Sequence, residues 1–184
     1  IMETLKLYFE GILVALQGVP MTVGVSLVAV LIGVILGLGI ALAKMSKHKG
    51  ISIPAKLYVE IIRGTPMLVQ ALILAYGLPQ LVQSLGGSFK WPYLLIPAMI
   101  VCGLNSAAYV AEIVRSGLQA VDKGQMEAAR SLGMTHGMAM RLVVIPQALK
   151  IVLPAFGNEF VSLIKETAVL SYVGVREILR RGTL

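Results

Sequence analysis

The segment from Asp122 to Pro154, DKGQMEAARSLGMTHGMAMRLVVIPQALKIVLP, is the one polar island between long apolar runs of the chain. Residues 125–132 are mostly good helix formers, so this half predicts a short helix. Asp122 can cap its start, and Gly133 can adopt the left-handed conformation that ends it. Thr135 can cap a second helix that runs into the next apolar segment. A short amphipathic helix between two membrane spans can lie across the membrane surface and dock into a partner's groove.

The composition of the 184 residues is that of an integral membrane protein. Hydrophobic residues make up 57% of the chain and charged residues 14%, against roughly 45–50% and about 25% in soluble domains. The net charge of +7 is carried by loops that flank apolar runs, which is typical of membrane orientation signals and leaves no surface for nucleic acid. Cys102 stands alone in an apolar run, so no intrachain disulfide can form. The two histidines lie far from any ligand pattern and support no metal site.

Four apolar segments are long enough to cross a lipid bilayer, because a spanning helix needs about 20 residues. The expected spans are at about residues 22–43, 67–85, 92–116 and 142–164. Lysine and arginine residues cluster between the first and second spans and again between the third and fourth, which marks both loops as cytoplasmic and places the amino terminus outside. The predicted fold class is therefore an all-α integral membrane bundle, with residues 1–184 forming one transmembrane domain.

Two patterns predict how the spans pack. Gly33, Gly37 and Ala41 form a small-residue stripe that lets another helix approach closely, within the subunit or at a dimer seam. The alternative is that glycine is simply common in membrane helices. Pro146 and Pro154 each remove a helical hydrogen bond and are expected to bend the fourth span. Bent helices of this kind occur beside the cavities of transporters.

The polar island also resembles a known motif. Glu127-Ala128-Ala129, followed by Gly133, Ile145-Pro146 and Leu153-Pro154, is similar to the EAA loop of permease subunits in bacterial ATP-binding-cassette importers. The surrounding sequence, KGQMEAARSLGM and RLVVIPQALKIVLPAFGNEFVSLIKET, resembles the polar amino acid uptake branch of that family. Further family-like motifs, RGTP at residues 63–66 and AYVAEIVR at residues 108–115, extend the resemblance over nearly the whole chain.

This resemblance implies that the loop at about residues 117–141 holds a coupling helix that docks on an ATPase subunit. The residues expected to make this contact are Gly124, Gln125, Glu127, Ala128, Ala129, Leu132 and Gly133. The alternative for the loop is an ordinary helical hairpin without a partner. The family also continues with another membrane helix, so the sequence, which begins at Ile1, is read as a trimmed portion of a longer permease that has a fifth span.

The partners implied by the resemblance are an ATP-binding-cassette ATPase, a second permease subunit in a homo- or heterodimer, and an extracytoplasmic amino-acid-binding protein. The implied location is the bacterial cytoplasmic (inner) membrane, where the chain contacts the lipid bilayer. No cofactor is expected on this chain, because it has no GxxxxGK[ST] phosphate loop, no GxSxG motif and no Cys/His cluster. ATP and Mg belong to the ATPase partner, and the chain itself is not expected to be an enzyme.

Polar side chains within the third and fourth spans are the candidates for a substrate site, because ionisable groups inside a membrane are energetically costly. The candidates are Asn105, Tyr109, Glu112, Asn158, Glu159, Ser162 and Lys165. We expect Lys165 to hold the carboxylate of an amino acid. Glu159 is the first choice for holding its ammonium or a basic side chain, and Glu112 is the second.

Structural alternatives stay open for the charged candidates. Glu112 can instead pair with Arg115 or Arg63, and Glu159 or Glu166 can pair with Lys165 and serve only to pack helices. The resemblance implies ATP-driven import of polar amino acids by alternating access, coupled through the EAA loop. A passive channel or export subunit for small polar solutes is the alternative function, and a purely structural membrane anchor is a third.

Overall fold

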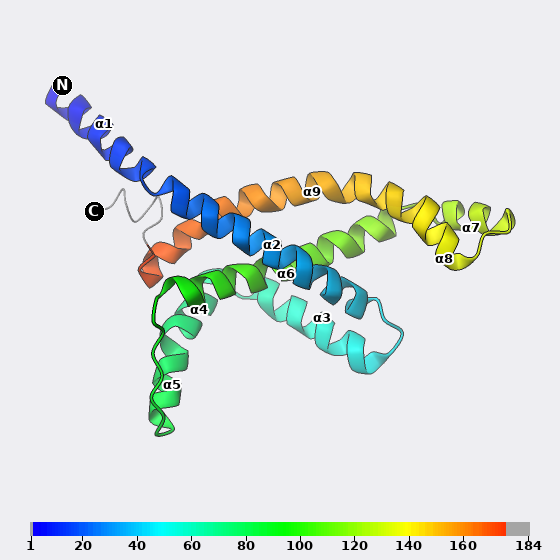
Figure 1. Cartoon of the computed structure of the whole chain (residues 1–184), viewed down its shortest axis with the longest axis horizontal. Helices are drawn as coiled ribbons and strands as arrows, with labels where there is room; N and C mark the ends of the chain where they lie inside the picture. Colours follow the sequence, from blue (N-terminus) through cyan, green and yellow to red (C-terminus); the bar gives the residue numbers. More distant parts are fainter. Residues whose placement is uncertain (1, 176–184) are drawn as a thin grey trace.

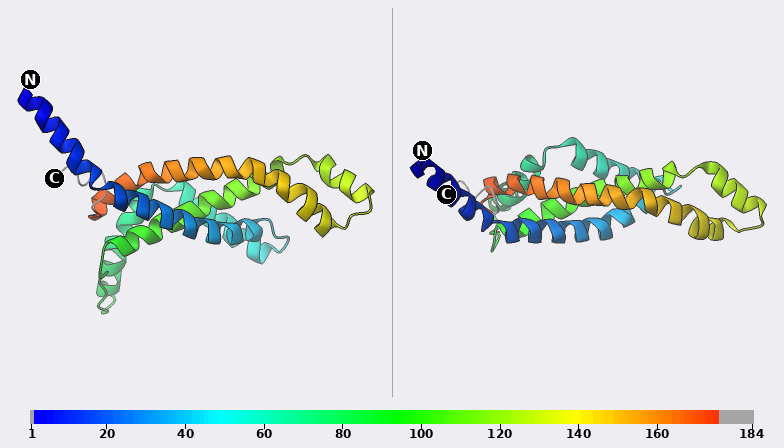
Figure 2. Two further views of the ribbon diagram at one scale, coloured as in Figure 1. Left: turned by 45° about the horizontal axis from the view of Figure 1, so that its top comes forward. Right: turned by 90° about the horizontal axis from the view of Figure 1, so that it is seen from above.

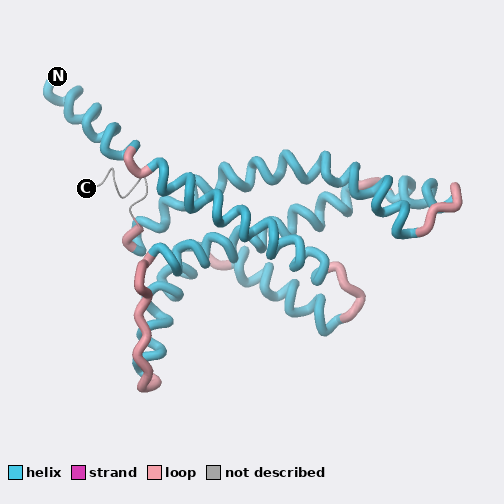
Figure 3. Tube along the Cα trace, in the orientation of Figure 1, coloured by secondary structure: helices cyan, strands magenta, loops and turns pink. Residues whose placement is uncertain are grey.

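The computed structural model describes the backbone of residues 2–175 and the side chains of residues 9–175. All regular structure within this range is helical (Figure 3), which confirms the all-α prediction. The elements in chain order are α1 (Met2–Leu16), α2 (Val19–Lys44), α3 (Lys49–Gly64), α4 (Met67–Leu72), the π-helical turn η1 (Ile73–Gly77), α5 (Leu78–Ser84), α6 (Leu95–Ala120), α7 (Lys123–Ser131), α8 (His136–Ala139), the π-helical turn η2 (Met140–Val144), α9 (Ile145–Glu166) and the 3-10 helix η3 (Thr167–Val173).

Four helical stretches of the described chain are long and apolar enough to cross a membrane, as the sequence predicts. They are Phe9–Lys44, Met67–Ser84, Leu95–Ala120 and His136–Val173. Two of them are longer than expected, because α1 and α2 join into one stretch and because α8, η2, α9 and η3 follow one another without a break. The fifth span expected from the resemblance falls outside the described residues.

The centre of the bundle is the pair α2 and α6, which cross in close contact (Figure 1). A side-chain carbon added at Gly37 would lie 2.7 Å from Cβ of Val110 and 2.8 Å from the carbonyl oxygen of Ala107. One added at Gly33 would lie 2.7 Å from Cβ of Ser106. Ala41, the third member of the stripe, is fully buried. The stripe is therefore a packing face within the subunit, where the missing side chains let two backbones approach.

Two further helices pack on this pair from different sides. Val59 of α3 is buried against Ala41 of α2 and against Ala108 and Ala111 of α6. The hydroxyl of Tyr58 donates a hydrogen bond to the Leu104 carbonyl at 2.6 Å, and burial raises the pKa of Tyr58 to about 12, so it stays a donor at neutral pH. α9 runs alongside α2 and α6 in both views of Figure 2.

Prolines account for the interruptions of the helices. Pro66 ends α3 at Gly64, because a residue before proline is disfavoured in the helical region. The Gln70 amide closes this break by donating to the Ile62 carbonyl at 2.8 Å and to the Thr65 hydroxyl at 2.8 Å. Both π-helical turns end two residues before a proline, η1 before Pro79 and η2 before Pro146. A proline leaves a carbonyl of the preceding turn without its helical partner, and a wider turn accommodates the ring.

The segment after α4 forms an arm that extends away from the bundle (Figure 1). Trp91 returns along this arm, and its indole N–H donates to the Leu74 carbonyl within η1 at 2.9 Å. The ring of Phe89 meets the Trp91 ring edge to face, with centroids 4.9 Å apart. The hydroxyl of Tyr76 ties η1 to the Val173 carbonyl at the end of η3. These contacts fix the arm at the end of the bundle that lies far from α7.

Candidate functional sites and relatives of the chain

The short helix α7 and the turn into α8 lie at the tip of the molecule opposite α1 (Figure 1). The Asp122 carboxylate accepts a hydrogen bond from the Gly124 amide at 2.6 Å, and the Thr135 hydroxyl accepts one from the Met138 amide at 3.3 Å. Gly133 has φ +85°. Its amide bonds to the Arg130 carbonyl at 3.0 Å, and the next amide bonds back to the Ala129 carbonyl at 3.2 Å. The predicted caps are thus confirmed, and both ends of α7 are fixed.

Most of the residues predicted to contact an ATPase are exposed in this chain. The exposed ones are Gly124, Gln125, Glu127, Ala128, Leu132 and Gly133. Leu132 is 81% exposed, although it is apolar. Ala129 is instead buried, on a helix that packs against α8 and η2. α7 therefore offers an exposed surface while its inner face is anchored.

A side-chain contact joins α7 to the long helix behind it. The Gln147 amide of α9 donates to the Gln125 side-chain oxygen of α7 at 3.1 Å. The Arg130 guanidinium also donates to the Met134 carbonyl at 3.2 Å, which braces the turn toward α8. Ala139, on the same turn, is fully buried. α7 is therefore linked to the start of α9 by a side-chain hydrogen bond.

A second group of polar side chains comes from α3, α6 and α9. Glu159 of α9 is half-buried, and its carboxylate is within electrostatic range of Arg63 and Glu166 and close to the Ser106 hydroxyl. That hydroxyl is fully buried and completes no hydrogen bond with another described residue. The Arg63 guanidinium lies over the Tyr109 ring, 4.9 Å from its centroid. The groups come from three helices and form what we call the Glu159 cluster: Arg63, Ser106, Tyr109 and Glu159.

The other predicted substrate residues lie around this cluster in different ways. Asn105 is 4% exposed and precedes Ser106 on α6. Ser162 is half-buried, whereas Asn158 and Lys165 are exposed on a flank of α9. Within residues 9–175, Lys165 makes no ion pair with Glu159 or Glu166, so the alternative of a packing ion pair is not found there.

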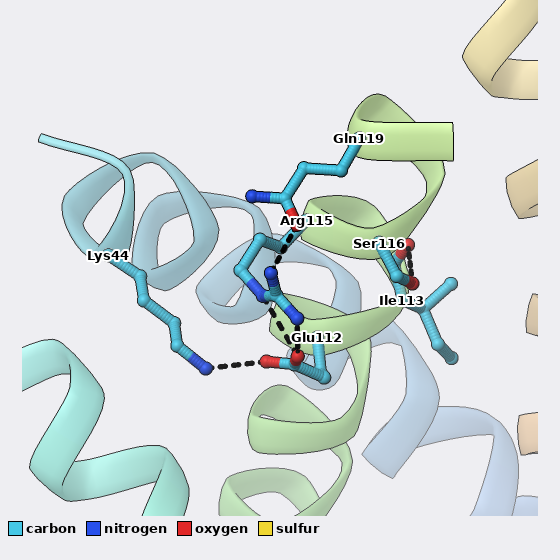
Figure 4. Close-up of polar contacts among 6 residues, drawn as sticks. All are labelled: Lys44, Glu112, Ile113, Arg115, Ser116 and Gln119. Carbon is cyan, nitrogen blue, oxygen red and sulfur yellow. Dashed lines mark hydrogen bonds and ion pairs between the residues drawn. The ribbon is translucent and has the colours of Figure 1, made fainter. Parts of the chain in front are cut away.

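Glu112 has partners that occupy its carboxylate (Figure 4). Lys44 of α2 donates to it at 2.5 Å, Arg115 donates to it through Nε at 2.8 Å, and Arg115 also reaches Gln119. The ion pair with Arg115 is the structural alternative expected for this residue, whereas Arg63 lies over Tyr109 instead. A substrate cation at Glu112 would have to displace one of two cations, so its role as a ligand stays a prediction.

Sequence reasoning missed Ser106 and Lys44 as members of polar sites, and it considered Arg63 only as a partner of Glu112. Arg63 has a sequence signal, since it is a cation at the break before Pro66, but its contact with Tyr109 depends on how α3 meets α6. Ser106 has no such signal, because small residues are common in membrane helices. Among the described residues, no group of His, Cys, Asp and Glu side chains is arranged to hold a metal ion.

Comparison with known proteins places this architecture in a family. Residues 33–183 match the family model described as binding-protein-dependent transport system inner membrane component. The arginine transport system permease protein ArtQ of Bacillus subtilis is 40% identical over 167 residues, covering 91% of this chain and 74% of the relative. The putative glutamine transport system permease protein GlnP of Rickettsia prowazekii is 35% identical over 177 residues, covering 96% and 78%.

Solved structures agree with this assignment. A crystal structure of an amino acid ATP-binding-cassette transporter with histidines superposes with a TM-score of 0.84 at 46% identity, covering 97% of this chain and 78% of that one. An inward-facing structure of the MetNI methionine transporter superposes with a TM-score of 0.70 at 21% identity over 91% and 77%, which supports the fold alone. The chain therefore belongs to the inner membrane components of binding-protein-dependent transport systems, as a permease of the polar amino acid ATP-binding-cassette importers.

Proposed function

We propose that this permease imports a polar amino acid by alternating access and that α7 receives the driving motion from a separate ATPase subunit, which holds ATP and Mg. The observation that supports this most directly is the construction of α7, which is exposed on its outer surface, capped at both ends and bonded to α9 through Gln125 and Gln147. The same helical stretch, His136–Val173, carries Glu159. One continuous helical stretch thus runs from the turn after α7 to the polar cluster.

The proposal includes a topology in the membrane. Lys44 and Lys49 lie near the end of α2, and Lys123 and Arg141 flank α7, so basic residues gather at one end of the spans. Because cytoplasmic loops carry this excess of cations, α7 faces the cytoplasm and the amino terminus lies outside. A second permease subunit completes the pathway, and an extracytoplasmic binding protein delivers the amino acid on the side opposite α7.

The substrate site is proposed at the Glu159 cluster. The Glu159 carboxylate binds the ammonium or the basic side chain of the amino acid, because it is half-buried and makes no ion pair among the described residues. The unsatisfied Ser106 hydroxyl and the buried Asn105 amide provide polar contacts from α6. Arg63, rather than Lys165, is the better-placed cation for the carboxylate of the substrate: both are exposed, but Arg63 already lies beside Tyr109.

The test is uptake of radiolabelled amino acids into vesicles that contain the complete transporter. Glu159→Gln should reduce uptake at least tenfold, because about 1.4 kcal/mol of lost charge interaction already corresponds to that factor. Glu10→Gln, which changes an exposed carboxylate outside the cluster, should leave uptake unchanged. Normal uptake by the Glu159→Gln transporter would remove this residue from the site.

Uptake by the same vesicles distinguishes the importer from a passive channel and from a structural anchor. A passive channel would equilibrate substrate without ATP and would copurify with no ATPase subunit. An importer accumulates substrate only when ATP is supplied to the face that carries α7. A structural anchor would show no flux in either condition, and substitutions at Glu127 or Gly133 would then alter assembly alone.

A further inference from the structure

A polar pocket at the end of α2 has no role in the proposed transport mechanism. It has a volume of about 530 Å³, and three cations reach it from three helices: Lys44 of α2, Lys56 of α3 and Arg115 of α6. Glu60 also lines the pocket, and the Glu112 carboxylate holds Lys44 and Arg115 in place. These five groups leave one positive charge in excess, so the pocket suits a ligand with a single negative charge.

Lys56 is the cation of this pocket whose ammonium is available. In the part of the chain that the structure describes, Lys44 bonds to Glu112, and Arg115 bonds to Glu112 and Gln119, but Lys56 has neither a hydrogen bond nor an ion pair. Two anchored cations beside a third that has no partner can bind an anion by charge-assisted hydrogen bonds.

An apolar groove on the α9 side of the α2–α6 pair meets this pocket at Met45. Its volume is about 340 Å³, and Met45 lines both the groove and the pocket. From Met45 the groove follows Leu42, Leu38 and Val34, which lie about one turn apart on α2, and its other walls are α6, η2 and α9. Every side chain that lines it is apolar. Eleven residues of helix span roughly 16 Å at 1.5 Å per residue, which is the length scale of an extended acyl chain.

The two features lie at the membrane depths that a phospholipid requires. Two of the three apolar stretches that form the groove, Phe9–Lys44 and Leu95–Ala120, end close to the pocket, so the pocket lies at the level of the headgroups and the groove lies within the hydrocarbon. Basic pockets between spans on the cytoplasmic side suit anionic headgroups.

We propose that the pocket and the groove together bind one anionic phospholipid of the inner leaflet. Its phosphodiester contacts Lys56 between Lys44 and Arg115, and one acyl chain passes Met45 and lies along α2. A phosphodiester carries one negative charge, which matches the excess charge of the pocket. A zwitterionic headgroup adds an ammonium that the three cations repel, so the site discriminates by headgroup charge.

Native mass spectrometry of the purified transporter, with the full-length permease, tests the proposal by titration with phosphatidylglycerol and with phosphatidylcholine of the same chain length. Phosphatidylglycerol should bind more tightly. Lys56→Gln should weaken its binding roughly fivefold, which corresponds to ~1 kcal/mol for one basic residue near the membrane surface. Lys49→Gln removes the same charge from the same helix but does not line the pocket, so it should have no effect.

Variants of the groove distinguish a lipid from a small anion. Leu38→Trp should fill the groove and lower phosphatidylglycerol binding, whereas Leu36→Trp, on the same helix but outside the groove, should not. If the transporter with Leu38→Trp does not assemble, Leu42→Trp serves as the groove-filling variant instead. Inorganic phosphate should not displace the lipid at millimolar concentration.

Three results would overturn the proposal. Equal binding of phosphatidylglycerol and phosphatidylcholine would show that the site does not discriminate by headgroup charge. Competition by inorganic phosphate together with normal binding by the groove variants would show a site for a small anion. Absence of bound lipid from the wild-type transporter would show that another protein segment covers the groove.

Discussion

Replacement of Gly37 by alanine tests whether the close approach of α2 and α6 holds the bundle together. The added Cβ would lie 2.7 Å from Cβ of Val110 and 2.8 Å from the Ala107 carbonyl oxygen, which is a backbone atom and cannot rotate away. The helices must separate by roughly 0.7–1 Å to restore ordinary contact distances. Inserting a methyl group into a packed interior costs about 1–3 kcal/mol.

Gly39 provides the matched control for this substitution. It lies on α2 two residues further on, and an added Cβ there meets nothing within 4 Å. Gly39→Ala has the same gain in helix propensity, up to about 1 kcal/mol, without the steric conflict. The difference between the two variants therefore isolates the packing of α2 against α6.

Thermal unfolding of the purified transporter, followed by size-exclusion chromatography after heating, measures this difference. At about 2–4 °C per kcal/mol for a chain of this size, we expect the Tm of Gly37→Ala to fall below that of Gly39→Ala by about 2–12 °C. Equal Tm values would refute the reasoning, because the only structural difference between the two positions is the neighbouring helix.

Two further predictions concern the ends of helices. A double-mutant cycle of Glu112→Gln and Lys44→Met can be measured by the same Tm assay. It should give a coupling energy of about 0.5–3 kcal/mol, as for other residues in contact. Additive effects would show that the ion pair does not join α2 to α6. Gly133→Ala should cost about 1–2 kcal/mol because of its positive φ and should lower ATP-driven uptake, whereas Gly137→Ala in the neighbouring helix α8 should not. Equal uptake by both would mean that the end of α7 does not matter for coupling.

Local features of this fold could be predicted from sequence because they depend on neighbouring residues. The caps of α7 and α8 follow from the hydrogen-bonding capacity of Asp122 and Thr135, and the end of α7 follows from the freedom of Gly133 to take positive φ. The four apolar stretches follow from length and hydropathy, which decide whether a helix is stable in lipid.

Features that depend on distant contacts could not be predicted in the same way. The ion pair of Lys44 with Glu112 joins residues 68 positions apart, and only the crossing of α2 over α6 brings them together. Ser106 became a candidate because Gly33 admits α6 so closely that its hydroxyl is fully buried. The prolines predicted bends, but the π-helical turns before Pro79 and Pro146 could not be foreseen, since proline also fits kinked α-helices.

Differences in packing between the helices suggest which parts of the permease move together. α2 and α6 meet through Gly33, Gly37 and the Glu112 ion pair, so they behave as one body. α9 meets α6 closely at Gly117, where an added Cβ would collide with Val152, and its base is joined to α7. Because α2 and α6 form one body and α9 is joined to α7 at its base, this packing favours motion of α9 against the α2–α6 pair.

The interruptions within this long helix determine how a motion of α7 would reach the Glu159 cluster. From His136 to Glu159 the chain rises roughly 35 Å at 1.5 Å per residue, and the regular α-helical hydrogen bonding on this path is interrupted at η2 and at Pro154. A displacement of α7 is therefore absorbed at η2 or transmitted through Gln147 to the part of α9 beyond it. Because Ser106 lies on α6 and Glu159 on α9, we infer that a motion of α9 against the α2–α6 pair would change the distance between these two residues and so open and close the cluster.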